Sequence, residues 1–264
     1  MTIMRFEWSG RQFAADLAKP LSIAIPLDFG GPQASCFDAP AASSRPLYPR
    51  LSCNCELLTL APHCNGTHTE CVGHLTSDRV AVSERVPGGL VLALLVTLSP
   101  VSAAASGEDS DPTPAADDRL VTAAALEAAS GRFDTARPAG MILRTAEAAS
   151  GPHRSYRGAA PAPYLSRQAA AWLVAREIQH VVLDLPSADR AEDGGRLTAH
   201  RIFFGLPPGS RRSQDAARPQ ASITELARIE ASIPDGWYLL DLQMPAFLSD
   251  AAPSRPLLYA AGFD

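Results

Sequence analysis

Long hydrophobic runs are missing from this chain of 264 residues. The longest, Leu90–Leu98, has nine residues, whereas a membrane-spanning helix needs roughly 20. The first ten residues (MTIMRFEWSG) contain no apolar segment of the kind that directs export. We therefore expect a protein that does not enter a membrane and that resides in the cytoplasm.

Positive charge is also scarce. Lys19 is the one lysine of the sequence, and 23 lysines and arginines stand against 28 acidic residues. Because nucleic-acid-binding surfaces need clustered basic residues, this balance argues against nucleic acid as a partner. Cysteines number five, and Cys53, Cys55, Cys64 and Cys71 lie close together in the sequence. In a reducing compartment such a cluster indicates reduced thiols or metal ligands before disulfides.

Short apolar segments alternate with helical ones in the second half of the chain. The expected strands are Leu90–Leu98, Met141–Arg144, Val181–Leu185 and Trp237–Leu242. The expected helices are Leu120–Ala129 and a segment capped by Ser166 that runs to about Gln179. This alternation predicts an α/β fold with a mixed sheet. We expect a single domain over residues 1–264, with loop insertions near 102–118 and 206–222.

The stretch 64–74 (CNGTHTECVGH) concentrates side chains that bind metals. Cys64, His68, Glu70 and His74 share an even register, so an extended chain would project them to one face. A straight strand would spread them over roughly 33 Å, but the two glycines of the stretch allow the backbone to bend. A thiol, two imidazoles and a carboxylate are the donors expected for zinc or a similar divalent ion. On spacing alone, hydrogen-bonded structural histidines are an equal alternative.

The same stretch resembles the signature of the cyclase family of metal-dependent hydrolases, which includes bacterial kynurenine formamidase. The family pattern is His-x-Gly-Thr-His-x-Asp-x-Pro-x-His, and residues 66–68 and His74 are in register with it. Similar segments follow at 143–145 (LRT), 164–166 (YLS), 183–189 (LDLPSAD), 223–226 (ITEL) and 234–238 (PDGWY). The resemblance implies a swivelling β/β/α fold in one domain, assembled as a homodimer or higher homo-oligomer.

The resemblance also implies roles for individual residues. His68 would ligate the metal, Glu70 would take the position of the bridging carboxylate, and His74 would be the catalytic acid and base. His200 and Glu225 would complete the metal site from the far end of the chain. The implied cofactor is a divalent metal ion, either zinc or manganese.

The sequence departs from the family pattern in one motif. Cys64 stands where the family has its first histidine ligand, and His63 lies one residue out of register. Glu70 stands where the family has aspartate, and Val72 replaces the usual proline. A Zn–S bond of about 2.3 Å and a longer carboxylate arm would both resize the same cavity. We therefore hypothesise that Cys64 is the first ligand and compensates for Glu70.

The implied reaction is hydrolysis of a non-peptide C–N bond in an aryl formamide, a cyclic amide or a related small carbonyl compound. A divalent metal lowers the pKa of bound water towards about 7 and polarises a carbonyl group. An amine leaving group needs a proton, which His74 would deliver. The alternative is a degenerate family member that keeps a structural metal without hydrolase activity. The changes at positions 64 and 70 favour that alternative, and the retained His74 favours the enzyme.

Some other residues admit two interpretations. Arg144 and Thr145 either orient a metal ligand, or Arg144 simply pairs with an acidic neighbour. Asp189 either faces a ligand or belongs to a structural turn, and we favour the turn. The loop 206–222 is either a solvated surface loop, which we favour, or a lid whose arginines bind a substrate carboxylate. His153 is expected to be an ordinary surface residue.

Overall fold

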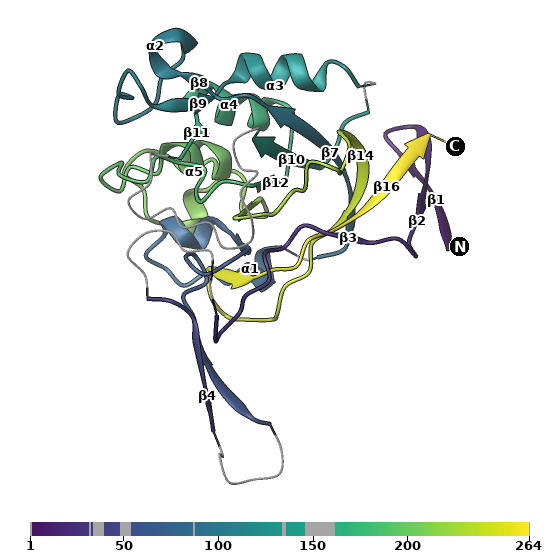
Figure 1. The fold of residues 1–264 in the computed structure, drawn as a ribbon. Helices are drawn as coiled ribbons and strands as arrows, with labels where there is room; N and C mark the ends of the chain where they lie inside the picture. Colours follow the sequence, from purple (N-terminus) through teal and green to yellow (C-terminus); the bar gives the residue numbers. More distant parts are fainter. Residues whose placement is uncertain are drawn as a thin grey trace.

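The centre of the molecule is an 11-stranded mixed sheet (Figure 1). The computed structural model describes residues 2–31, 33, 40–47, 54–86, 88–133, 136–145 and 162–263, so Cys53 and His153 lie outside the described residues. In spatial order the sheet contains β1 (Ile3–Trp8), β2 (Arg11–Asp16), β16 (Leu257–Phe263), β14 (Gly236–Asp241), β7 (Leu90–Leu98), β10 (Gly140–Thr145), β12 (His180–Leu183), β13 (Ser222–Glu225), β6 (His68–Glu70) and β15 (Ala251–Pro253), with β3 (Leu21–Ser22) paired to β16. This architecture confirms the predicted α/β class with a mixed sheet.

Parallel strands form the middle of this sheet. β7 pairs with β10, β10 with β12, and β12 with β13, all in parallel. The residues from Leu92 to Val96 in β7 are buried, as expected for a continuous apolar strand that is covered on both faces. Antiparallel strands flank this block: β14 joins β7, and β6 joins β13. The four strands predicted from apolar runs are therefore confirmed, with ends that shift by one or two residues.

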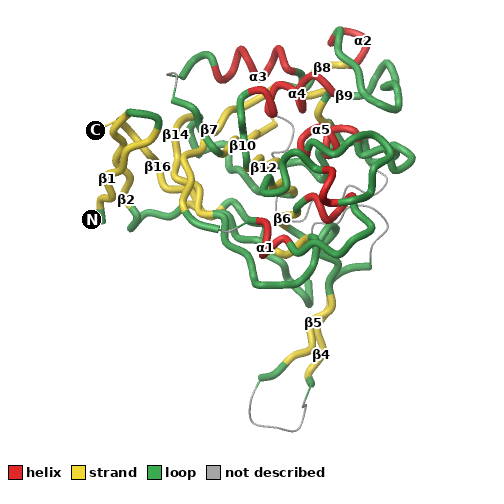
Figure 2. The backbone as a smooth tube through the Cα atoms, turned by 180° about the vertical axis from the view of Figure 1, so that it is seen from behind, coloured by secondary structure: helices red, strands yellow, loops and turns green. Residues whose placement is uncertain are grey.

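The helices are short. They are α1 (Val82–Arg85), α2 (Ala103–Ser106), α3 (Ala123–Ser130), α4 (Arg167–Ala175) and α5 (Thr198–Phe204), with the 3₁₀ turns η1 (Val72–Leu75) and η2 (Ser213–Asp215). α3 packs on β7, and α4 packs on both α3 and α5 (Figure 2). Within the described part of the chain, no helix has the length and apolar character that crossing a bilayer requires.

The structure confirms one predicted helix start and corrects another. Ser166 caps α4, since its hydroxyl accepts a hydrogen bond from the Ala169 N–H at 2.9 Å. That helix ends at Ala175 and not near Gln179, because Glu177 adopts a left-handed φ of 60°.

The predicted helix Leu120–Ala129 is wrong in its first turn. Arg119–Val121 forms β9, which lies between β8 (Val101–Ser102) and β11 (Tyr164–Leu165) in a three-stranded sheet. α3 begins only after Thr122, whose hydroxyl accepts a hydrogen bond from the Ala125 N–H at 3.1 Å. Strand pairing thus overrides the helix propensity of the flanking alanines.

A hairpin of β4 (Ser43–Pro46) and β5 (Glu56–Thr59) projects away from the rest of the molecule (Figures 1 and 2). Leu57 and Leu58 on β5 are 41% and 48% exposed. The chain runs from β5 through a turn at residues 61–65 into β6. The hairpin therefore joins the body of the protein beside the strand that carries His68 and Glu70.

Candidate metal centre

Four of the predicted ligands come from segments far apart in the sequence and lie close together in the structure. His68 and Glu70 lie on β6, Glu225 ends β13, and His200 lies on α5. β6 and β13 are antiparallel, with His68 opposite Glu225. All four side chains are buried, with 0 to 3% of each residue exposed. The sheet register therefore creates an enclosed cluster of two imidazoles and two carboxylates.

The donor atoms of this cluster approach one another closely. His200 Nε2 lies 2.7 Å from Glu70 Oε1 and 3.5 Å from Glu225 Oε1, and His68 Nε2 lies 3.5 Å from Glu225 Oε2. Despite these distances, His68 Nε2, His200 Nε2 and both carboxylate oxygens of Glu70 form no hydrogen bond of acceptable geometry. Buried polar atoms rarely lack such partners. Their convergence fits a metal ion that would accept all of their lone pairs.

Hydrogen bonds on the far side of each ring set the orientation of the two buried histidines. His68 Nδ1 lies 3.1 Å from the Gly66 carbonyl oxygen, and His200 Nδ1 lies 2.6 Å from Asp189 Oδ2. A carbonyl or carboxylate oxygen only accepts, so each Nδ1 carries the proton and donates it. In the neutral ring Nε2 then presents a lone pair to the cluster. Metal-bound histidines are typically held in this way, and the turn interpretation of Asp189 missed this contact.

Buried carboxylates require compensating positive charge. Burial raises the pKa of Glu70, but the adjacent His74 and His200 outweigh it and hold that pKa well below its usual range. Burial lowers the pKa of His200, but Glu70, Asp189 and Glu225 outweigh it and raise that pKa well above its usual range. Both shifts favour bound protons on the imidazoles beside the buried carboxylates. A divalent cation would supply the same charge and release these protons.

His63, rather than Cys64, approaches the cluster. Among the described residues, the groups of potential ligands with atoms within 4.8 Å of one another include His63 with His68 and Glu70, and none includes Cys64. His63 Nδ1 lies 2.8 Å from Glu70 Oε2. Residues 61–65 form a turn, in which the N–H groups of Cys64 and Asn65 both donate to the Ala61 carbonyl at 3.0 Å. The proposed pairing of Cys64 with Glu70 stays a prediction.

His74 lies at the exposed edge of the cluster. Its side chain is 27% exposed, and its ring centroid lies 4.2 Å from that of His63 and 5.6 Å from that of His200. It belongs to a further group of potential ligands with Glu70 and His200, and to another with His63 and Asp250. Asp250 belongs to no motif in the sequence, and only the pairing of β15 with β6 brings it here.

Arg144 and Thr145 form hydrogen bonds that stabilise the sheet. The Arg144 guanidinium donates to Asp235 Oδ1 at 2.8 Å and to the Thr97 hydroxyl at 2.6 Å. The Thr145 N–H donates to Asp184 Oδ2 at 2.7 Å. These contacts tie β10 to the segments around it and confirm that Arg144 pairs with an acidic neighbour.

The loop 206–222 is attached next to η1, at the same exposed edge. The Ser77 N–H donates to the Arg211 carbonyl at 2.8 Å, and the Ser213 N–H donates to Asp78 Oδ1 at 3.1 Å. The Arg218 guanidinium donates to the Phe203 carbonyl at 2.6 Å. These hydrogen bonds hold the loop in place beside His74. The favoured interpretation as a solvated surface loop, and the alternative of a lid that binds a substrate carboxylate, both stay predictions.

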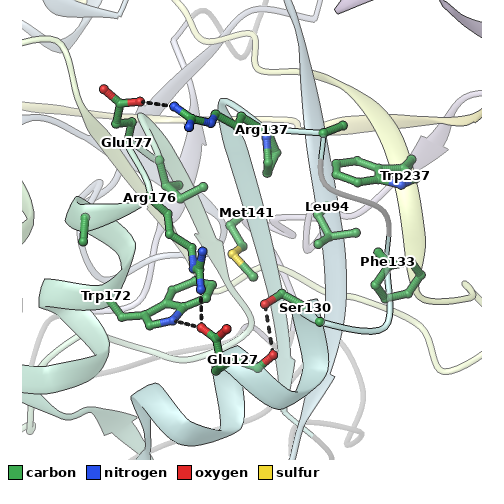
Figure 3. Close-up of a pocket in the computed structure, with 15 residues that line it drawn as sticks. Leu94, Glu127, Ser130, Phe133, Arg137, Met141, Trp172, Arg176, Glu177 and Trp237 are labelled. Carbon is green, nitrogen blue, oxygen red and sulfur yellow. Dashed lines mark hydrogen bonds and ion pairs between the residues drawn. The ribbon is translucent and has the colours of Figure 1, made fainter. Parts of the chain in front are cut away.

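The cavity shown in Figure 3 is a separate feature. It has a volume of about 520 Å³, and its lining, which includes Trp172, Trp237, Met141 and Leu94, contains none of the cluster residues. Its charged groups pair with one another: the Arg176 guanidinium with Glu127, and Arg137 with Glu177 at 3.5 Å. This cavity therefore has apolar residues in its wall and charged residues that pair with one another. It is not part of the candidate centre.

Fold and cluster together point to one class of protein, and comparisons with known proteins identify it. The model of the cyclase family matches residues 15–190, and the chain belongs to this family. The match ends before His200 and Glu225, which the structure brings next to the motif on α5 and β13. No curated protein sequence matches the chain.

Solved structures share the fold at low sequence identity. A potential metal-dependent hydrolase with cyclase activity has a TM-score of 0.61 and 16% identity, over 91% of this chain and 97% of that one. Isatin hydrolase A from Ralstonia solanacearum has a TM-score of 0.61 and 14% identity, over 92% of each chain. Isatin hydrolase A from Labrenzia aggregata, bound to benzyl benzoate, has a TM-score of 0.59 and 14% identity, over 92% of this chain and 93% of that one. These similarities establish a common fold.

Proposed function

We propose that this protein is a metal-dependent hydrolase that cleaves a C–N bond in a small cyclic amide or aryl formamide. The observation that carries the proposal is the convergence of buried donor atoms of His68, Glu70 and His200 without hydrogen-bond partners. Two charged carboxylates in that cluster favour a divalent cation. The fold shared with isatin hydrolases supports the choice of a cyclic amide, the bond that isatin contains.

The ligands in this proposal are His68, Glu70, His200 and Glu225, with His63 in the place first assigned to Cys64. Imidazole and carboxylate donors suit zinc, and manganese is the alternative metal. When bound, a divalent metal supplies an activated water and polarises the substrate carbonyl. Because His63 provides the imidazole that position 64 lacks, the donor set is complete, which argues against a degenerate protein.

His74 is the proposed acid and base. Its place at the exposed edge, next to the rings of His63 and His200, lets it reach both a bound substrate and solvent. Hydrolysis of an amide requires a proton on the leaving nitrogen, since an amine anion is a poor leaving group. His74 would accept a proton as the carbonyl is attacked and return it to that nitrogen.

Hydrolysis by the purified protein tests the function. The protein is stripped with a chelator, reconstituted with Zn²⁺ or Mn²⁺, and assayed on isatin, an aryl formamide and a simple aryl ester. We expect metal-dependent turnover of at least one amide and its loss on chelation. Stoichiometric metal without turnover on any amide would instead support the degenerate alternative.

We also propose that the protein is a homo-oligomer. An isolated two-stranded hairpin is at best marginally stable, and the β4–β5 hairpin carries exposed Leu57 and Leu58, which a second copy of the chain would cover. Light scattering should show a dimer or larger assembly. Replacing both leucines with serine should shift it towards monomer, whereas Val101→Ser, at a similarly exposed position, should not. A wild-type monomer would contradict this proposal.

The cytoplasm is the proposed location. Cys55 and Cys71 carry free thiols, a state that a reducing compartment maintains. Fractionation of cells that express the tagged protein should recover it with the cytoplasmic proteins.

A further inference from the structure

His63 reaches the cluster from a turn, so its ring needs an anchor outside β6. Asp250 lies immediately before β15, which pairs antiparallel with β6 so that Ala251 is opposite Glu70. The Cys71 N–H donates to the Asp250 carbonyl at 3.0 Å and extends this pairing by one residue. The sheet register thereby fixes the backbone of Asp250 next to the cluster.

The Asp250 carboxylate contacts the outer nitrogen of His63. Asp250 Oδ2 lies 2.8 Å from His63 Nε2, while His63 Nδ1 lies 2.8 Å from Glu70 Oε2 on the other side of the ring. The ring therefore lies between two carboxylates, one at the exposed edge and one buried. With the Nε2 proton donated to Asp250, the neutral ring directs the Nδ1 lone pair towards Glu70.

Gly73 makes the close approach of Asp250 possible. A Cβ atom at position 73 would lie 2.9 Å from Asp250 Cβ and 2.5 Å from the Val80 carbonyl oxygen. Both distances are shorter than real Cβ atoms tolerate, so a side chain here would displace the segment that carries Asp250. The second glycine of the motif thus provides the space in which the carboxylate reaches His63.

We propose that Asp250 is a positioning residue that orients His63, so that Nδ1 of this ring serves as the metal donor that position 64 does not provide. The inference rests on the proposed metal centre and deepens it. It explains how a histidine one residue out of register can occupy the first ligand position. A carboxylate behind a metal-bound histidine typically contributes 10- to 100-fold in metal affinity.

Zinc affinity, measured by competition with a chromophoric chelator, tests the proposal without any substrate. Asp250→Asn should weaken Zn²⁺ binding by about 10- to 100-fold and leave the number of bound ions unchanged. The matched control is Asp241→Asn at the end of β14, where the carboxylate accepts a hydrogen bond from Gln243 Nε2 at 2.9 Å. This control should bind Zn²⁺ within about twofold of wild type, since its charge change is the same and no histidine is involved.

Asp250→Asn is also made in proteins that lack the His63 ring, which tests whether Asp250 acts through that ring or only through its charge. In His63→Ala, Asp250→Asn should cause no additional loss of affinity, because the ring that it orients is gone and its other histidine contact, His74 Nδ1 at 3.6 Å, is not a proposed ligand. The double variant His63→Ala/Cys64→His moves the imidazole into the family register, and Asp250→Asn should be silent there as well. Circular dichroism of each variant verifies folding.

The results that would contradict the proposal can be told apart. Unchanged zinc affinity in Asp250→Asn, or an equal loss in the His63→Ala background, overturns the positioning role while the metal centre stands. Loss of one whole equivalent of zinc makes Asp250 a direct ligand, with His63 and His74, and also overturns it. A wild-type protein that binds no divalent metal refutes the proposed function and this inference together.

Discussion

Replacing Asp189 with asparagine examines how His200 is held. Asp189 is 4% exposed, and its carboxylate accepts hydrogen bonds from His200 Nδ1 at 2.6 Å, His200 N at 3.1 Å and Ala199 N at 2.7 Å. An amide keeps one oxygen and turns its NH₂ group towards at least one of these donors. An unpaired buried donor costs about 1–3 kcal/mol. We therefore expect Asp189→Asn to lower the unfolding free energy of the metal-free protein by about 2 kcal/mol.

The same substitution should also weaken metal binding, because the His200 ring loses its anchor. We expect Zn²⁺ affinity to fall by about 10- to 100-fold. Urea denaturation in the presence of a chelator measures the stability, and a chelator competition measures the affinity.

Asp193→Asn is the matched control for this pair of measurements. Asp193 is also buried, and its carboxylate accepts hydrogen bonds from Gly195 N at 2.7 Å and Leu197 N at 2.6 Å. It should lose a similar amount of stability and keep wild-type zinc affinity. Wild-type zinc affinity in Asp189→Asn would refute the argument that Asp189 orients a metal ligand.

Three further predictions concern other residues. His74→Ala should keep its metal, measured by emission spectroscopy, and lose about 10²- to 10⁴-fold in kcat, whereas full activity would exclude the acid–base role. Cys64→Ala should retain bound zinc, and His63→Ala should bind zinc more weakly than wild type. Weaker binding in Cys64→Ala together with unchanged binding in His63→Ala would show that the thiol is the ligand. Burial and the charge of Arg218 lower the pKa of His180 to about 4, so the unfolded state binds more protons between pH 6.5 and 4, and stability falls as the pH decreases through this window. Between pH 7 and 5 the loss from this residue is about 2 kcal/mol, and His180→Asn should remove it in urea denaturation at the two pH values.

Local signals were sufficient for much of the fold. The uninterrupted apolar run of β7 predicts a strand because its nine residues are short for a buried helix and suit a strand covered on both faces. Ser166 predicts a helix start because its hydroxyl satisfies a backbone N–H. The start of α3 was misplaced because β9 forms by pairing with strands elsewhere in the chain. Propensity within residues 120–129 carries no information about that pairing.

The residues of the candidate centre also fall into those that the sequence predicts and those that only the folded chain brings in. His68, Glu70 and His74 lie in one motif, so the sequence places them together, and the resemblance adds His200 and Glu225. The proposed exchange of Cys64 for His63 rests on the conformation of a five-residue turn. The contact with Asp250 depends on a strand pairing that joins β6 to β15, more than 180 residues later. Pro62 and the dipeptide Asn65–Gly66 signal the turn but not which side chain faces the cluster, and the strand pairing has no local signal.

Anomalous diffraction from crystals of the zinc-reconstituted protein, recorded at the zinc absorption edge, tests the central claim most directly. We predict a strong difference peak within bonding distance of His68 Nε2, the Glu70 carboxylate and His200 Nε2, about 2.0–2.2 Å from the nitrogen and oxygen donors. A peak at Cys64 or Cys71 without these residues, or no peak between β6 and α5, would contradict a metal centre at this position.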